Sequence, residues 1–273
     1  MKIKNIDLYL SSYDLVFHYT KRNIALNYIL KEQNLKFSER KKTNDPFEHL
    51  VFSIDTSNSA YSFFFNTISS YKLSDKESSK LKADIFRIIN FETRQISFCK
   101  NSNIEKKNDR FGFLKPRMWA QYGENYKGVC LAFDRKELLN EITNQFKNCI
   151  YTNDVFYKYF SEMEDKTYNI INTASNEEND YDYYYKTGLE ESINQIFFTK
   201  HIDYEHENEF RIVKSTNTNN FIKWCSSLKA IFINEKYFMK TKIYDIVELS
   251  KKYNIPIFVI IWNYNHIDYY MLK

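Results

Sequence analysis

The segment MWAQYGENYKGVCLAFD (118–134) contains the end of one helix, a turn, a strand and the start of a second helix. Pro116 is suited to the first position of the first helix, because that position needs no backbone N–H. Gly123 ends this helix, and KGVCLAF (127–133) is apolar enough for a core strand. Asp134 then has the character of an N-cap residue. The segment therefore predicts helix, strand and helix in close succession.

Similar apolar runs on both sides of this segment predict the other strands. These are 15–19, 94–100, 149–159, 209–214, 228–234 and 256–263. Helices alternate with them only irregularly, without the βαβα rhythm of a doubly wound protein. We therefore expect an α+β fold with a mixed or antiparallel central sheet and flanking helices.

The helices are predicted from caps and from apolar residues at helical spacing. Thr20 is a candidate cap for a helix on which Ile24, Tyr28 and Ile29 share a face, and Ser74 with Glu77 forms a capping box. Asp134 and Glu137 form a similar cap. Further helices are expected at 59–71 and at 240–253, and one more helix is expected to follow the acidic stretch 161–182 and to end at Lys200.

Composition and length limit the possible classes of protein. A chain of 273 residues with 43% apolar residues is compatible with one domain, and we expect a single domain over 1–273. With only 4 Gly, the chain contains neither a phosphate-binding P-loop nor a dinucleotide-binding glycine motif. The acidic, Asn-rich stretch 161–182 is expected to be an exposed insertion and the least ordered part of the chain.

Charge is unevenly distributed, although the net charge is only +4. From Lys100 to Lys127 there are seven basic and three acidic side chains, and from Ser161 to Glu191 nine acidic and two basic. The basic loop 100–117 is expected to border a cavity and to attract an anionic ligand or substrate. Its contacts are assigned to Lys106, Lys107 and Arg110. The alternative is a solvated surface loop.

Cysteine spacing and the N-terminal segment bear on location. The four cysteines show no metal-binding or redox spacing, so we expect free thiols in a reducing compartment. The segment MKIKNIDLYLSSYD lacks the apolar region of a signal peptide, and no apolar run reaches membrane-spanning length. We expect a cytoplasmic protein, and its oligomeric state stays open.

Four segments carry unusual polar residues beside predicted strands. They are FHYT (17–20), TNDPFE (43–48), MWAQYGENYKGVCLAFD (118–134) and YEHENEFRIV (204–213). In this order they resemble the bacterial family known as domain of unknown function 2971, over roughly residues 15 to 235. That resemblance implies a fold and a site but no reaction.

The same segments resemble, more distantly, the ADP-ribosyltransferase superfamily. This resemblance implies a split-sheet fold and NAD as substrate, with no metal. It assigns ribose binding to His18, beside Tyr19 and Thr20, and stacking on nicotinamide to Tyr122, with Trp119 or Tyr126 as alternatives. Glu209 would stabilise the oxocarbenium-like transition state, assisted by Glu207 and oriented by Arg211. Asn44 and Asp45 would contact the substrate.

Each candidate residue also has a structural interpretation. His18 can be a hydrogen-bonded strand histidine, and Trp119 and Tyr122 can be core residues. Asn44 and Asp45 can form a turn. The two carboxylates and Arg211 can form a structural ion pair, with Phe210 on the opposite face of their strand.

Three functions are therefore compared. The leading hypothesis is an NAD-dependent ADP-ribosyltransferase-like enzyme, a toxin or phage-defence effector that modifies nucleic acid or protein. It requires His18 and Glu209 to lie on neighbouring strands and to line one cavity. The second is a metal-dependent hydrolase or nuclease that uses Asp45, Glu48, Glu207 and Glu209. The third is a non-catalytic nucleotide-sensing module.

Overall fold

The computed structural model describes most of the chain. The described residues are 6–43, 45–49, 74–102, 110–147, 149–159, 161–162, 181–235, 240–264 and 266–272. The helix predicted at 59–71 and nearly all of the acidic stretch 161–182 lie outside them, as do Asn44, Lys106 and Lys107.

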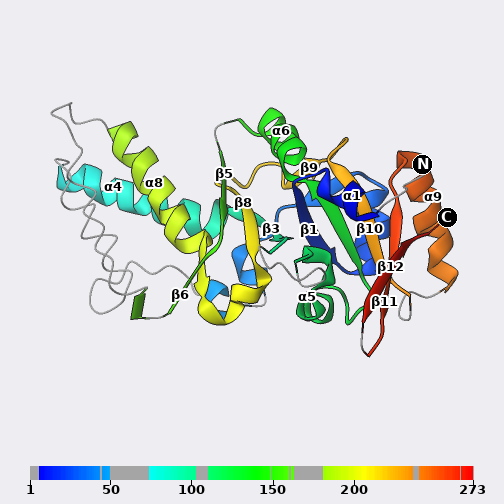
Figure 1. Ribbon diagram of the computed structural model, residues 1–273. Helices are drawn as coiled ribbons and strands as arrows, with labels where there is room; N and C mark the ends of the chain where they lie inside the picture. The colour runs from blue at the N-terminus through cyan, green and yellow to red at the C-terminus, as the bar shows by residue number, and fades with distance from the viewer. Residues whose placement is uncertain are drawn as a thin grey trace.

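An eight-stranded sheet forms the centre of the fold (Figure 1). Its order is β12-β11-β10-β4-β1-β3-β8-β5, and all neighbours are antiparallel except β10 and β11, which are parallel. The strands are β1 (Leu15–Thr20), β3 (Arg94–Lys100), β4 (Val129–Asp134), β5 (Ile150–Asp154), β8 (Glu209–Lys214), β10 (Leu228–Asn234), β11 (Ile257–Trp262) and β12 (Ile267–Met271). The expected α+β fold with a mixed antiparallel sheet is confirmed.

Two small sheets accompany the large one. In the first, β2 (Asn34–Lys36) pairs antiparallel with β9 (Phe221–Lys223). In the second, β6 (Phe156–Lys158) pairs parallel with β7 (Thr199–His201). The second sheet brings Lys200, at the middle of β7, close to β8.

Both faces of the large sheet are covered, because apolar residues occur at successive positions of its central strands. All six residues of β4 are buried. Leu131 and Phe133 pack into one core cluster, and Cys130 and Ala132 into a second cluster on the other face. Continuous apolar runs are expected for strands that are covered on both sides.

The helices and short helical turns lie around this sheet. They are α1 (Ile6–Ser11), α2 (Arg22–Ile24), η1 (Ala25–Leu30), η2 (Arg40–Lys42), η3 (Pro46–His49), α4 (Asp75–Arg87), η4 (Ile88–Glu92), η5 (Gly112–Leu114), α5 (Pro116–Gln121), α6 (Arg135–Gln145), α8 (Tyr181–Phe197), η7 (Ile202–Glu207) and α9 (Lys240–Tyr253). Helices α4 and α8 pack together at the β5 end of the sheet, and α9 lies at the other end (Figure 1). No helix among the described residues is both long and apolar enough to cross a membrane.

The predicted caps of α4 and α6 are confirmed. Ser74 and Glu77 form the expected capping box before α4. The Asp134 carboxylate accepts a hydrogen bond from the Glu137 backbone N–H at 3.0 Å. Pro116 is the first residue of α5, as its missing N–H predicts.

The prediction for the helix after β1 is wrong in two respects. Thr20 is the last residue of β1, and the N-cap is Lys21, whose side chain caps nothing. The helix then widens into a π-helical segment, η1, which changes the face that it buries. As a result Ile24 and Tyr28 are exposed, whereas Ile29 is buried together with Ala25, Leu26 and Leu30.

The turn between α5 and β4 closes with Gly128, which permits a very close approach to β1. A Cβ atom at Gly128 would lie 2.3 Å from the Thr20 carbonyl oxygen and 2.8 Å from the Gly123 carbonyl oxygen. Both are backbone atoms, so neither can rotate away. We expect Gly128→Ala to lower the free energy of unfolding by about 1–3 kcal/mol, measured by urea denaturation. Lys127→Ala, at the exposed neighbouring position, is the control and should change it by less than about 0.5 kcal/mol.

Candidate functional site

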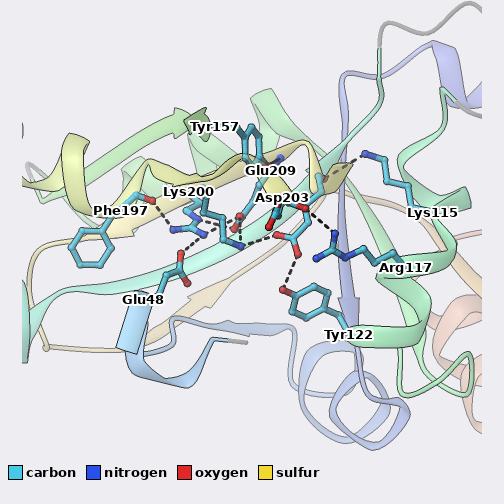
Figure 2. Close-up of polar contacts among 11 residues, drawn as sticks. Glu48, Lys115, Arg117, Tyr122, Tyr157, Phe197, Lys200, Asp203 and Glu209 are labelled. Atoms are coloured by element: carbon cyan, nitrogen blue, oxygen red, sulfur yellow. Dashed lines mark hydrogen bonds and ion pairs between the residues drawn. The ribbon is translucent and has the colours of Figure 1, made fainter. Parts of the chain in front are cut away.

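A buried ion pair between Arg211 and Glu209, of which Glu209 is labelled in Figure 2, lies at the centre of the site. Both residues are on β8, two positions apart, so they share one face of the strand. Arg211 is fully buried, and its Nε and Nη2 donate to the two Glu209 carboxylate oxygens at 2.7 and 2.9 Å. Its Nη1 donates to the Phe197 carbonyl oxygen at 2.7 Å. The guanidinium is therefore bound bidentately, the strongest geometry for such a pair.

Glu48 brings a second carboxylate to the same guanidinium. It lies on η3, and its Oε1 forms an ion pair with Arg211 Nη2. Glu48 is 4% exposed, and its Oε2 has no hydrogen-bond partner within the described part of the chain. The TNDPFE segment thus contributes a buried acid to the site.

Lys200 connects the pair to a third carboxylate, that of Glu207. The Lys200 ammonium lies 2.7 Å from Glu207 Oε2 and 3.3 Å from Glu209 Oε2. The Tyr122 hydroxyl donates to Glu207 Oε1 at 3.1 Å. We call Glu48, Lys200, Glu207, Glu209, Arg211 and Tyr122 the buried ion network.

The cations of the network control the protonation of Glu209. Burial alone would raise the pKa of its carboxyl, but the positive charges of Arg211 and Lys200 lower it by more than burial raises it. The resulting pKa is about 2. Burial likewise lowers the pKa of Lys200, yet the neighbouring carboxylates, Glu209 first, raise it above its usual value. Glu209 and Lys200 are therefore charged at neutral pH.

Tyr122 is held as a neutral phenol. Burial, and then the negative charge of Glu207, raises its pKa well above the usual value. The phenol thus keeps its proton and acts as a hydrogen-bond donor to Glu207.

Glu207 and Glu209 both contact Lys200, but they do not lie on one strand as predicted. Glu207 ends η7, and Asn208 has a left-handed conformation (φ 46°), so the strand begins only at Glu209. Asn208 is stabilised there by a hydrogen bond from its side chain to the Asn101 carbonyl oxygen at 2.8 Å. Sequence alternation is wrong for Glu207, although it is correct for Glu209 and Arg211, with Phe210 on the opposite face.

A pocket of about 570 Å³ lies between the end of β3, the start of α5 and η7. Its lining residues are Lys100, Asn101, Ser102, Leu114, Lys115, Pro116, Arg117, Met118, Glu205, His206 and Asn208. Both described ends of the basic loop, 100–102 and 114–117, line this pocket, but His18 and Glu209 do not, so it is not the cavity that the loop was expected to border.

Two cations of the pocket wall donate hydrogen bonds to backbone oxygens. Lys115 Nζ lies 2.9 Å from the His206 carbonyl oxygen and 3.5 Å from that of Glu207. Arg117 Nη1 donates to the Asp203 carbonyl oxygen at 3.0 Å, as Figure 2 shows. Across the residues that the structure describes, no carboxylate forms an ion pair with either side chain.

The structure contradicts the arrangement expected for His18. Strand β3 lies between β1 and β8, so His18 and Glu209 are not on neighbouring strands. Phe17 pairs with Cys99, and Cys99 with Glu209, which puts these three side chains on one face of the sheet. His18 follows Phe17 and projects from the opposite face.

His18 instead has a structural contact. Its Nδ1 lies 3.1 Å from the Ser97 carbonyl oxygen, and its ring packs against Phe98. Burial lowers its pKa, so the ring is neutral at neutral pH and Nδ1 carries the donated proton. Thus His18 and Glu209 do not line one cavity.

Three other residues assigned to cofactor binding are part of the core. Tyr19 donates its hydroxyl to the Gly112 carbonyl oxygen at 2.5 Å, and its ring packs edge-on against Trp119. Trp119 is fully buried and donates Nε1–H to the Phe113 carbonyl oxygen at 2.8 Å. Thr20 is also buried. None of the three lines the pocket.

Of the residues assigned to substrate contacts, the structure describes Asp45 and Arg110, and neither lines the pocket. Asp45 is buried just before η3, where its carbonyl oxygen accepts from the Glu48 backbone N–H at 3.0 Å. The Arg110 guanidinium lies over the Phe111 ring and does not line the pocket. Asn44, Lys106 and Lys107 lie outside the described residues.

Sequence interpretation missed the cations that complete the site. Lys200 stands between the polar residues Thr199 and His201, so its segment carries no signal that it is buried and paired. Lys115 and Arg117 were counted in the basic loop but were not singled out, although they flank Pro116 at a predicted helix start.

The four carboxylates of the metal hypothesis do not form a coordination group. Among the described residues, no cluster of three or more His, Cys, Asp or Glu side chains is arranged to hold a metal ion. Glu48, Glu207 and Glu209 instead pair with Lys200 and Arg211.

Fold and site together define an α+β protein with a buried ion network beside a basic pocket. Among protein families, residues 118–212 match the one described as protein of unknown function (DUF2971). The match covers the MWAQYGENYKGVCLAFD segment and most of YEHENEFRIV, and it supports the first resemblance. No curated protein and no solved structure matches the chain. The resemblance to ADP-ribosyltransferases has no support from these comparisons.

Proposed function

We propose that this protein binds a phosphate-bearing ligand of the nucleotide class in the basic pocket. The observation that carries the proposal is the pair Lys115 and Arg117, two pocket cations that bind carbonyl oxygens and, among the described residues, form no ion pair with a carboxylate. An ammonium has three donors and a guanidinium five, so both side chains keep donors for an anion. Strong hydrogen bonds from such cations to phosphate are the usual basis of phosphate recognition.

The size and lining of the pocket also fit a nucleotide. Its volume lies within the range of small-molecule sites. Leu114, Pro116 and Met118 line the pocket with apolar surface beside the cations. A nucleotide needs both, because its base packs on apolar surface and its phosphate binds cations. In this proposal the protein is a nucleotide-sensing module in the cytoplasm, where its buried free thiols would stay reduced.

Binding should depend on the two pocket cations. We expect the double variant Lys115→Gln, Arg117→Gln to bind ADP about a hundredfold or more weakly in calorimetry, because each lost charge-assisted hydrogen bond costs about 1.5–3 kcal/mol. The loss should be largest at low salt. Lys31→Gln, Lys251→Gln removes two exposed lysines that do not line the pocket and is the control. Equal affinities for both double variants would refute the assignment.

ADP-ribosyl transfer from NAD in a form that does not use His18 is a second candidate, and the Tyr122–Glu207 hydrogen bond is the observation in its favour. It joins an aromatic ring and a carboxylate that the superfamily resemblance assigned to the reaction, beside a pocket wall. NAD would be a substrate whose diphosphate occupies the same pocket. Release of nicotinamide from NAD tests this candidate, with and without nucleic-acid or protein acceptors, and binding without release favours the sensing module. Adding Mg²⁺ to the same assays tests the hydrolase hypothesis.

A further inference from the structure

The Tyr122–Glu207 hydrogen bond connects the two walls of the basic pocket. One wall is the start of α5, with Lys115, Arg117 and Met118, and the other is η7, with Glu205 and His206. Tyr122 is the C-cap residue of α5 and Glu207 is the last residue of η7. Figure 2 shows Tyr122 and Arg117 extending from the same helix toward the η7 side.

The η7 wall has few other attachments to α5. Lys115 and Arg117 contact its carbonyl oxygens, and the Arg117 guanidinium also lies 5.4 Å from the Tyr204 ring centre. These are the same two cations that the proposed ligand would engage. Among the described residues, the Tyr122–Glu207 hydrogen bond is thus a side-chain contact between the walls that a bound anion would leave intact.

Tyr122 is itself fixed by an unusual turn. The three residues after Gly123, namely Glu124, Asn125 and Tyr126, all have left-handed backbones, with φ of 52°, 50° and 68°. L-residues with side chains rarely adopt this conformation, and consecutive examples need strong local support. Such strain is concentrated where the structure must hold a functional group in place.

Contacts to separate parts of the fold supply that support. Glu124 accepts a hydrogen bond from the Arg22 backbone N–H at 3.0 Å, and the Tyr126 carbonyl oxygen accepts one from Asn234 at 3.0 Å. The Tyr126 ring also packs edge-on against Trp262. The turn is therefore anchored to the start of α2, to β10 and to β11, and Tyr122 inherits this rigid position.

We propose that Tyr122 is a positioning residue whose hydrogen bond to Glu207 fixes the separation of the two pocket walls and so preorganises the anion site. This inference rests on the proposed function. Glu207 holds the η7 end of the contact because Lys200 pairs with its other oxygen. Tyr122 therefore acts on the ligand through η7 and does not touch it.

Tyr122→Phe tests this role, because it removes one hydroxyl and keeps the ring. Tyr9→Phe is the matched control: it also removes a half-buried tyrosine hydrogen bond, to the Lys229 carbonyl oxygen at 2.8 Å, and Tyr9 does not line the pocket. We expect Tyr122→Phe to bind ADP and pyrophosphate about five- to tenfold more weakly, a typical coupling between linked sites. Tyr9→Phe should bind as the wild type does.

Hydrogen–deuterium exchange without ligand gives a second, independent measurement. We expect faster exchange in 202–208 for Tyr122→Phe and unchanged exchange there for Tyr9→Phe. If the wild type binds no anion but Tyr122→Phe still accelerates exchange in η7, the proposed function fails and the connection between the walls stands. If affinity falls without faster exchange, Tyr122 contacts the ligand directly, and the positioning role is wrong. Unchanged affinity and unchanged exchange also refute it.

Discussion

Glu209→Gln should lower the free energy of unfolding by about 3–5 kcal/mol, the usual cost of removing one partner from a buried ion pair. Arg211 has no exposed surface, and Glu209 accepts from two of its nitrogen atoms. The amide fits the same space but has no negative charge, and its NH₂ group would face a guanidinium. Glu48 alone would then balance the charge of Arg211.

Urea denaturation followed by circular dichroism measures this change. Glu248→Gln, at an exposed position of α9, is the matched control and should change stability by less than about 0.5 kcal/mol.

The Glu209→Gln variant also tests whether Glu209 is catalytic. A Glu209→Gln protein that keeps its stability but loses nicotinamide release from NAD would favour a catalytic Glu209, whereas lower stability with proportional activity favours the structural ion pair.

Local sequence signals predicted the elements whose formation depends on near neighbours. The caps at Ser74 and Asp134 and the proline at position 116 act within one helical turn, so they are visible in the chain itself. The runs at 94–100, 209–214 and 228–234 are buried on both faces and are unambiguous as strands. Together with the runs at 15–19, 127–133, 149–159 and 256–263, they account for seven of the eight strands of the central sheet.

Elements that depend on tertiary contacts were not predicted. Strand β9 has three residues, too few for a periodic pattern, and it forms because β2 lies beside it. Strand β12 alternates between half-buried and exposed residues, which is typical of an edge strand, but its polar residues hide the pattern. In η1, a π-helical turn rotates the buried face away from Tyr28, a change that 3.6-residue periodicity cannot show.

Only the part of the site that depends on near neighbours in the sequence could be predicted. Glu209 and Arg211 could be paired because alternation along one strand puts them on one face. Lys200 and Glu48 join them only through β7 and η3, and nothing in their own segments specifies that contact. The His18 assignment failed because chain order does not give sheet order: β3 lies between β1 and β8, and strand alternation turns His18 to the opposite face.

The protein should also lose stability in acid over the range in which Glu209 titrates in the unfolded chain but not in the folded protein. The pKa of this carboxyl is about 2 in the folded protein, against a usual value of 4.5. A lowered folded-state pKa means that the unfolded state binds the proton more tightly. Its stabilising contribution is therefore complete above pH 4.5 and is lost as the pH falls from 4.5 to about 2. The shift corresponds to about 3 kcal/mol, as an order of magnitude.

Urea denaturation at a series of pH values between 2 and 7 measures this loss, and Glu209→Gln removes the titrating group. The stability of the wild type should fall more steeply with acid than that of the variant, and the two should converge near pH 2. Glu248→Gln should follow the wild-type profile in slope. Parallel profiles for the wild type and Glu209→Gln would show that the carboxyl has the same proton affinity in both states, which is incompatible with a charged Glu209 held by Arg211 and Lys200.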